Sequence, residues 1–179
     1  MGVRISKSDM TIDIPRIDVS RFGRAVGRAE SNIRYANSIL QGARKMLHED
    51  YLRPPAQDYE NAKGFYLKAR EDLERASKLL DKATPEQRAR YQQSQTAAGA
   101  FVDSMIKEGV ALGSDYIVSA QMNIRNGDKA TTPADKWKAY QNAGFAVQDG
   151  LNNLRPFKGL VGAAEGSSIS GLSDVDTKS

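Results

Sequence analysis

The 179-residue chain contains no cysteine and a single histidine, His48. Without cysteine there is no disulfide, no thiolate metal site, no iron–sulfur cluster and no thiol nucleophile. A single histidine excludes multi-histidine metal sites and paired histidines for acid–base catalysis within one chain. These two absences remove several large classes of enzyme from consideration.

Long hydrophobic runs and aromatic residues are also scarce. The longest apolar stretches span a few residues, well below the ~20 of a transmembrane helix, so no stable membrane span is expected. Residues 1–19 lack the apolar core of about 7–15 residues that marks a secretory signal. Aromatic residues make up 7% of the chain and the mean hydropathy is −0.56. This composition is typical of a slender helical protein.

Basic residues are concentrated near the amino terminus. The chain has a formal net charge of +4, whereas residues 1–47 hold nine basic and four acidic residues, a local net charge of +5. Arg21, Arg24 and Arg28 recur at spacings of three and four and therefore share one helical face. This face is a candidate contact for a polyanion or for acidic groups on a partner chain. No recognised nucleic-acid motif accompanies it.

The segment FGRAVGRAESNIRYANSILQGARKML (residues 22–47) predicts a helix over about 20–52. Its apolar residues recur at every third or fourth position, and large side chains alternate with alanine. Pro54 and Pro55 end the helix because they remove backbone donors and disfavour the helical conformation just before them. The stripe consists of Phe22, Val26, Ala29, Ile33, Ala36, Leu40, Ala43 and Leu47.

A second helix, expected over about 57–83, repeats this pattern. Alanine at one of the two seam positions lets two backbones approach closely and leaves room for large side chains of the partner helix. Two such helices joined by a short turn predict an antiparallel hairpin. The alternative is that each stripe faces a different part of the core. The second stripe consists of Tyr59, Ala62, Tyr66, Ala69, Leu73, Ala76 and Leu80.

Two more helices are expected over about 85–126 and 133–154. Thr84-Pro-Glu-Gln87 has the form of a capping box with proline at the first helical position, and Thr132-Pro opens the fourth helix in the same way. Gly127 is expected to end the third helix in the left-handed conformation. The fourth helix has its own apolar stripe, with Trp137 expected as a core anchor. That stripe consists of Trp137, Tyr140, Gly144, Val147, Leu151 and Leu154.

The two ends of the chain differ from the helical part. Residues 1–19 are interpreted as an extended N-terminal arm in which Met10, Ile12 and Ile14 alternate with polar residues and could dock on a neighbouring subunit. A frayed terminus with accidental alternation is the alternative. Residues 156–179 are rich in Gly and Ser and are interpreted as a C-terminal tail with Leu160 among its possible docking points. The expected fold is therefore all-α: an elongated antiparallel helical hairpin or bundle of about four long helices over 20–155, with extended ends.

No pattern in the sequence indicates catalysis. Glu49 and Asp50 follow His48 directly, but consecutive helical residues point about 100° apart rather than toward each other. No glycine-rich phosphate loop, nucleophile elbow or metal-ligand spacing is present. We therefore expect a protein that is not an enzyme and has no cofactor and no metal site.

Two stretches carry a resemblance to a known group of proteins. The basic arm with IPRIDVSRFGRAVGRAESNIRYAN (residues 14–37) and the helix TPEQRARYQQSQTAAGAF (residues 84–101) resemble the front portions of internal or ejection proteins of tailed-phage virions. The resemblance implies a virion location, partners among copies of the chain and other particle proteins, and non-specific contact with DNA. It does not extend to a lytic-enzyme signature or a hydrophobic span.

These observations favour a non-enzymatic structural or assembly protein of a multi-subunit particle, most simply a bacteriophage virion, that oligomerises through its Ala/large helix seams. Two alternatives remain open. One is a basic nucleic-acid-binding accessory protein of the cytoplasm, which the charge at the amino terminus favours. The other is a helical factor of a bacterial export system, a class that also tends to lack cysteine.

Overall fold

The computed structural model of the chain describes residues 18, 20–49 and 56–160, and the side chains of residues 46–49 are not included. This part is all-α, as predicted. Two short 3-10 turns, η1 and η2, join or follow the long helices. The elements are α1 (Arg21–Glu49), α2 (Ala56–Ser77), η1 (Leu80–Lys82), α3 (Pro85–Lys129), α4 (Pro133–Asn153) and η2 (Arg155–Phe157).

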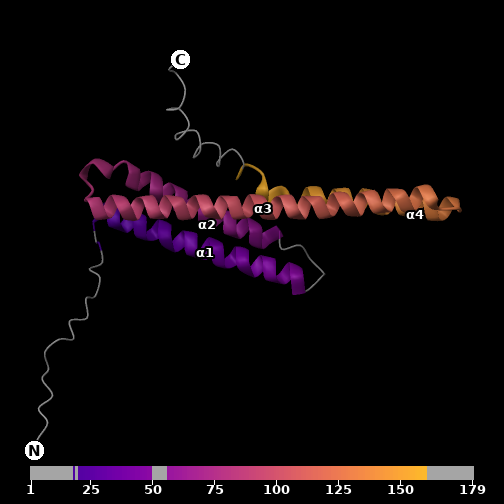
Figure 1. The fold of residues 1–179 in the computed structure, drawn as a ribbon, viewed down its shortest axis with the longest axis horizontal. Helices are drawn as coiled ribbons and strands as arrows, with labels where there is room; N and C mark the ends of the chain where they lie inside the picture. The colour runs from indigo at the N-terminus through magenta and orange to yellow at the C-terminus, as the bar shows by residue number, and fades with distance from the viewer. Residues whose placement is uncertain (1–17, 19, 50–55, 161–179) are drawn as a thin grey trace, which may run out of the picture.

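The molecule is elongated around α3, which has 45 residues and is therefore ~68 Å long. Figure 1 shows α1 and α2 beside the amino-terminal part of α3, and α4 folded back along its carboxyl-terminal part. One helix thus belongs to two packing units. We call the second unit, from Gly109 of α3 through α4, the distal hairpin.

Local signals at the start of each helix explain most of the boundaries. Ser20 caps α1, because its hydroxyl accepts a hydrogen bond of 2.9 Å from the backbone N–H of Gly23. The predicted capping box at Thr84 is present, with both reciprocal bonds to Gln87 formed. Thr132 accepts a bond of 3.1 Å from the backbone N–H of Asp135 and caps α4.

The second helix ends earlier than expected. α2 stops at Ser77 rather than at 83, and the chain continues through η1. The Ser77 hydroxyl donates a 2.7 Å bond to the carbonyl of Glu74, and the backbone tightens to 3-10 bonding from Leu79 onward. This turn redirects the chain toward Thr84 and leaves Leu80 partly buried against the core.

The expectation for Gly127 is wrong. α3 continues to Lys129, and Gly127 is an ordinary helical residue inside it. Its lack of a side chain serves packing, since a Cβ there would lie 2.6 Å from Cε1 of Tyr140. The glycine with positive φ in the described part of the chain is Gly159, just after η2.

The main core lies between α1, α2 and the first half of α3. The Tyr66 and Phe101 rings stack with centroids 5.5 Å apart, and Phe22 meets Tyr91 at 6.2 Å. Met105 closes this core with no exposed surface. The core therefore combines the α1–α2 stripes with aromatic and sulfur-containing residues of α3.

The chain returns to the core after α4. The Phe157 ring lies 4.9 Å from that of Tyr59 and covers Gly109, where a Cβ would come within 2.9 Å of the ring. Leu160, an expected docking point, is only 1% exposed. Packing therefore extends to residue 160, beyond the expected boundary at 155, and fastens the base of the distal hairpin.

Candidate functional site

The predicted seam is covered within a single chain. Its side chains in α1 and α2 are buried or nearly so, and they pack against one another and against α3. Leu47 lies in α1, but its side chain is outside the described set, and Leu80 is partly buried in η1. Seam positions that are filled internally cannot also bind a second molecule. Oligomerisation through the Ala/large seams, as the sequence suggested, is therefore replaced by intramolecular packing. The buried members are Phe22, Val26, Ala29, Ile33, Ala36, Leu40, Ala43, Tyr59, Ala62, Tyr66, Ala69, Leu73 and Ala76.

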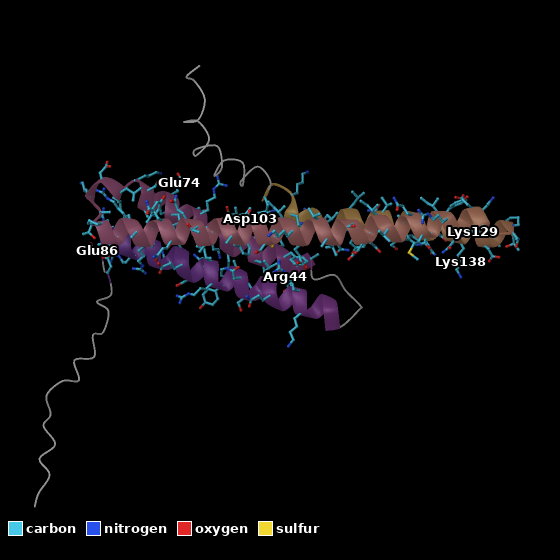
Figure 2. The ribbon with its side chains drawn as sticks, viewed as in Figure 1. Arg44, Glu74, Glu86, Asp103, Lys129 and Lys138 are labelled. Atoms are coloured by element: carbon cyan, nitrogen blue, oxygen red, sulfur yellow. The ribbon has the colours of Figure 1, made fainter. Side chains whose placement is uncertain are left out.

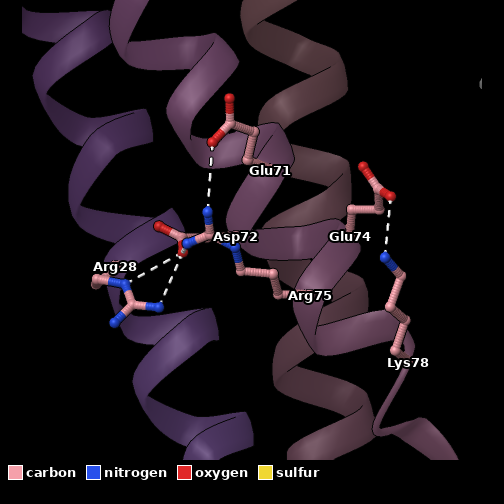
Figure 3. A network of polar contacts seen from close by, with 6 residues as sticks. All are labelled: Arg28, Glu71, Asp72, Glu74, Arg75 and Lys78. Atoms are coloured by element: carbon pink, nitrogen blue, oxygen red, sulfur yellow. Dashed lines mark hydrogen bonds and ion pairs between the residues drawn. The ribbon is translucent and has the colours of Figure 1, made fainter.

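The three candidate arginines do not form one free basic face. The Nε and Nη2 atoms of Arg28 donate bonds of 3.1 and 3.0 Å to Oδ1 of Asp72 on α2, which also accepts a 3.2 Å bond from Arg75 (Figure 3). The Asp72 side chain is only 7% exposed, so it needs these donors. Arg28 thus links α1 to α2. Arg21 and Arg24 remain exposed, and neither side chain bonds to another residue that the structure describes.

A second ion pair links α1 to α3. Nε and Nη2 of Arg90 donate bonds of 2.7 and 2.6 Å to the two carboxylate oxygens of Glu30. This bidentate geometry is the strongest form of such a pair. The bonds from Arg90 hold the pKa of the Glu30 carboxyl below its ordinary value of 4.5. The pair is partly exposed and serves to fix the register of α1 on α3.

A third cluster joins all three helices of the core near the start of the distal hairpin. Glu108 accepts a 2.7 Å bond from Nε of Arg44 and a 2.9 Å bond from the Tyr59 hydroxyl. Arg44 also donates to the backbone carbonyl of Ser104 at 3.0 Å. Burial, reinforced by the bond to Glu108, raises the pKa of Tyr59. A tyrosine that stays protonated and bonded in this way is a structural group, because it cannot act as a base at neutral pH.

The described residues contain no grouping suited to metal binding, because no three His, Cys, Asp or Glu side chains converge. A depression of about 430 Å³ is lined by Leu80, Asp81, Arg88, Tyr91, Gln92 and Gln95. Its polar groups are not arranged as a nucleophile with a neighbouring base, and Tyr91 accepts a bond from Gln95. No helix in the described part is both long and apolar enough to cross a bilayer.

The distal hairpin packs through small residues. Beyond Leu112, its buried positions in the two helices are Ala120 and Gly127 of α3 and Ala143 and Gly150 of α4, and tyrosine rings lie over the glycines. A Cβ on Gly150 would lie 3.1 Å from Tyr116, just as one on Gly127 would meet Tyr140. The two helices therefore contact each other along a small-residue face on each.

The large apolar residues of the distal hairpin are left exposed. Trp137, the expected core anchor, is 66% exposed, which makes that expectation wrong. The other large members of the predicted fourth stripe, except the partly buried Leu154, are exposed as well. Exposed residues of α3 add a second row. We call these residues together the distal face: Val110, Ile117, Ile124, Trp137, Tyr140, Val147 and Leu151, which are 41–68% exposed.

Figure 2 shows the side chains of the distal hairpin projecting on all sides of α3 and α4, with Lys129 and Lys138 near its tip. In the core, by contrast, Arg44 on α1 lies close to α3, to which it is bonded. The arm residues Met10, Ile12 and Ile14 lie outside the described residues. The α4 row of the distal face is thus a predicted apolar stripe for which the described chain provides no cover.

Comparison with known proteins gives no match: no family model, no curated protein and no solved structure is similar to this chain. A family is therefore not established, and the function has to be inferred from the chain's own surfaces.

Sequence reasoning found the residues of the distal face in α4 but assigned them to the core. It missed Val110 and Ile124 in α3, although they repeat with Ile117 every seven residues. It also missed the inter-helix ion pairs, since Arg28 and Asp72 are 44 positions apart. To predict this ion pair from the sequence, one would need to know the register in which α1 and α2 align.

Proposed function

We propose that the protein is a non-enzymatic structural component of a multi-subunit particle, and that the particle is a bacteriophage virion. The observation that carries the assembly role is the distal face, a set of exposed large apolar residues on a hairpin that projects from the core. The virion as the particle rests on the resemblance of residues 14–37 and 84–101. Monomeric soluble proteins rarely expose contiguous apolar patches of this kind, and such patches mark sites of protein–protein interaction.

The internal organisation of the chain supports the same proposal. The α1–α2–α3 core satisfies its own apolar stripes and its buried carboxylate, so it does not need a partner to fold. The distal hairpin contributes few buried large side chains and places its apolar residues outward. A folded core that carries a projecting hairpin with exposed apolar residues suits an assembly role. Catalysis would instead require polar groups that converge in a cleft.

The test is incorporation into particles. We expect mass spectrometry of gradient-purified virions, produced from a phage genome that encodes this chain, to detect the chain in fixed proportion to the other structural proteins. The double substitution Val147→Glu/Leu151→Glu should reduce that proportion, because it places two charges on the distal face. Phe145→Glu, which changes an exposed residue outside that face, is the matched control. A chain that remains entirely in the unassembled fraction would contradict the proposal.

A second candidate function rests on Arg21 and Arg24. Both are exposed at the start of α1, and their side chains lack a bonded partner among the described residues. They could contact phosphates without sequence selectivity. Titration of the chain with duplex DNA at two salt concentrations tests this role: salt-sensitive binding that Arg21→Glu/Arg24→Glu abolishes supports it, and binding that does not change with salt contradicts it.

A further inference from the structure

We infer that the distal face binds the distal face of a second copy of this chain, so that two distal hairpins form a four-helix bundle. This inference rests on the proposed assembly function and names the partner. The homodimer would be the building unit, and the core of each copy would remain outside the contact.

The two rows of the distal face have the spacing of a helix–helix seam. Val110, Ile117 and Ile124 recur every seven residues along α3. On α4, Trp137, Tyr140, Val147 and Leu151 recur at intervals of three, seven and four, the positions that face a partner in a coiled-coil bundle. Three other exposed large residues of the two helices, Val118, Met122 and Phe145, lie off these rows. The spacing of the two rows is that of a seam whose partner is another helix pair.

Both rows lie on the same side of the distal hairpin. At about 100° per residue, each row is roughly a quarter turn from the small-residue face of its own helix, in the same rotational sense. Because α3 and α4 run in opposite directions, the same sense of rotation brings both rows to one side. A direct contact agrees with this placement: the Tyr140 hydroxyl donates a 2.8 Å bond to Asp128, which follows Ile124 by four residues on α3.

The available area is that of a modest homodimer. Seven side chains that are about half exposed, at ~100 Å² each, supply ~700 Å² per copy, close to the ~800 Å² per partner of a standard specific interface. The same face also contains the chain's single tryptophan and a tyrosine, which are enriched in the central positions of interfaces. The area is thus sufficient for a reversible dimer without any further segment.

The charge of the distal hairpin favours a partner like itself. Residues 109–154 contain four basic residues (Arg125, Lys129, Lys136, Lys138) and four acidic residues (Asp115, Asp128, Asp135, Asp149), a net charge of zero. The net charge of +4 of the whole chain therefore lies outside this segment. Two copies can bring their distal hairpins together without net repulsion, whereas a strongly charged partner, such as a nucleic acid, finds no complementary field there.

Trp137 provides a direct readout on the intact chain. We expect sedimentation equilibrium to give a monomer–dimer equilibrium, and we expect the emission of Trp137 to shift to shorter wavelength over the same rise in protein concentration. Leu151→Glu should weaken the dimer at least ~100-fold, because the new carboxylate would be buried without a partner. Since Leu151 is exposed in the monomer, the helical circular dichroism of this variant should be unchanged.

Phe145→Glu is the matched control. Phe145 is 57% exposed on α4 and lies off both rows, so this substitution adds the same charge to the same helix without affecting the dimer. A chain that stays monomeric at all concentrations overturns the inference. So does a dimer that is lost with Phe145→Glu but kept with Leu151→Glu. A short-wavelength Trp137 emission in a monomer also overturns it, because another part of the same chain would then cover the distal face.

Dimerisation and particle incorporation can fail separately. A dimer that never enters a virion contradicts the proposed function and leaves the self-association intact. A chain that enters virions but is monomeric in solution overturns the self-association alone, and the distal face must then bind a different virion protein.

Discussion

In the α1–α2 hairpin, large and small apolar residues share one stripe, and both kinds are buried. In the distal hairpin the two kinds are divided: alanines and glycines face the partner helix, and the residues of the distal face lie about a quarter turn away and are 41–68% exposed. The periodicity of the large residues is similar in both. Regular spacing therefore marks an apolar helix face, and it does not show whether the same chain buries that face.

The nature of the small residues explains the division. Between α1 and α2 they are alanines, and each leaves a shallow site that a large side chain of the other helix can fill. Between α3 and α4 two of them are glycines, and the Tyr116 and Tyr140 rings lie flat against the exposed backbone. These rings occupy the contact, so aliphatic residues such as Val147 remain outside.

The largest expected difference between the two hairpins is in large-to-small substitution. Leu40→Ala, at a seam position that is 1% exposed, should lower the free energy of unfolding by about 2–5 kcal/mol. Leu151→Ala should change it by less than about 0.5 kcal/mol at a concentration that keeps the chain monomeric. Urea denaturation followed by circular dichroism measures both. Equal losses of unfolding free energy at Leu40 and Leu151 would contradict the difference between buried large residues in the α1–α2 hairpin and exposed large residues on the distal face.

Polar contacts give the next largest expected effect. Asp72→Ala should cost about 1–3 kcal/mol of stability, because Arg28 then loses its acceptor on α2 and Arg75 keeps only its pair with Glu71. Glu74→Ala, on the same helix, removes only the exposed pair with Lys78 and should cost no more than about 0.5 kcal/mol (Figure 3). Thermal denaturation of the two variants side by side measures the difference, and a larger loss for Glu74→Ala would contradict the geometry.

Acid should loosen α1 from α3. The bonds from Arg90 hold the pKa of Glu30 below its ordinary value of 4.5, so the folded state binds this proton less tightly than the unfolded state. The resulting stability is present above about pH 4.5 and is lost as the pH falls through the lowered pKa. We expect Glu30→Gln to cost about 1 kcal/mol at neutral pH and to make the denaturation midpoint less sensitive to acid. Acid titrations of the parent chain and of Glu30→Gln measure this difference. If Glu30 were unpaired, the denaturation midpoints of the two proteins would fall with decreasing pH at the same slope.

The smallest expected effects have opposite signs within one helix. Gly99 has open space where a Cβ would be placed, so Gly99→Ala should stabilise α3 by about 0.5–1 kcal/mol. At Gly109 a Cβ would meet the Phe157 ring at 2.9 Å, and Gly109→Ala should destabilise by about 1 kcal/mol despite the same gain in helix propensity. Melting temperatures of the two single variants provide the measurement. Stabilisation by both would mean that Phe157 does not hold the base of the distal hairpin.

The sequence predicted the starts of the helices well because local signals determine them. Ser20, Thr84 and Thr132 cap the residues just after them, and such signals need no knowledge of the fold. α2 was predicted too long because nothing local marks a helix end at Ser77 as clearly as proline or glycine would. Gly127 was misread because a glycine that admits a neighbouring ring looks, in sequence, like a glycine that ends a helix.

The candidate site was less predictable because it depends on which face each helix presents. The α1–α2 stripes could be identified since no other apolar face competes with them. In α4 the sequence predicts that the stripe of large residues is buried, whereas the structure buries Ala143 and Gly150. The glycines and tyrosines that pair between α3 and α4 were the only residues that indicated burial of the small-residue faces. Recognising these pairs requires the register of the two helices.

The continuous helix α3 determines how far the tip of the distal hairpin lies from the core. Residues 109–129 carry the helix ~30 Å past the point where Phe157 fastens it. A partner that binds the tip of the distal hairpin is therefore held away from α1 and α2 by the length of this helical segment. A molecule built in this way can join its neighbours at one end and still present the exposed side chains of Arg21 and Arg24 at the other.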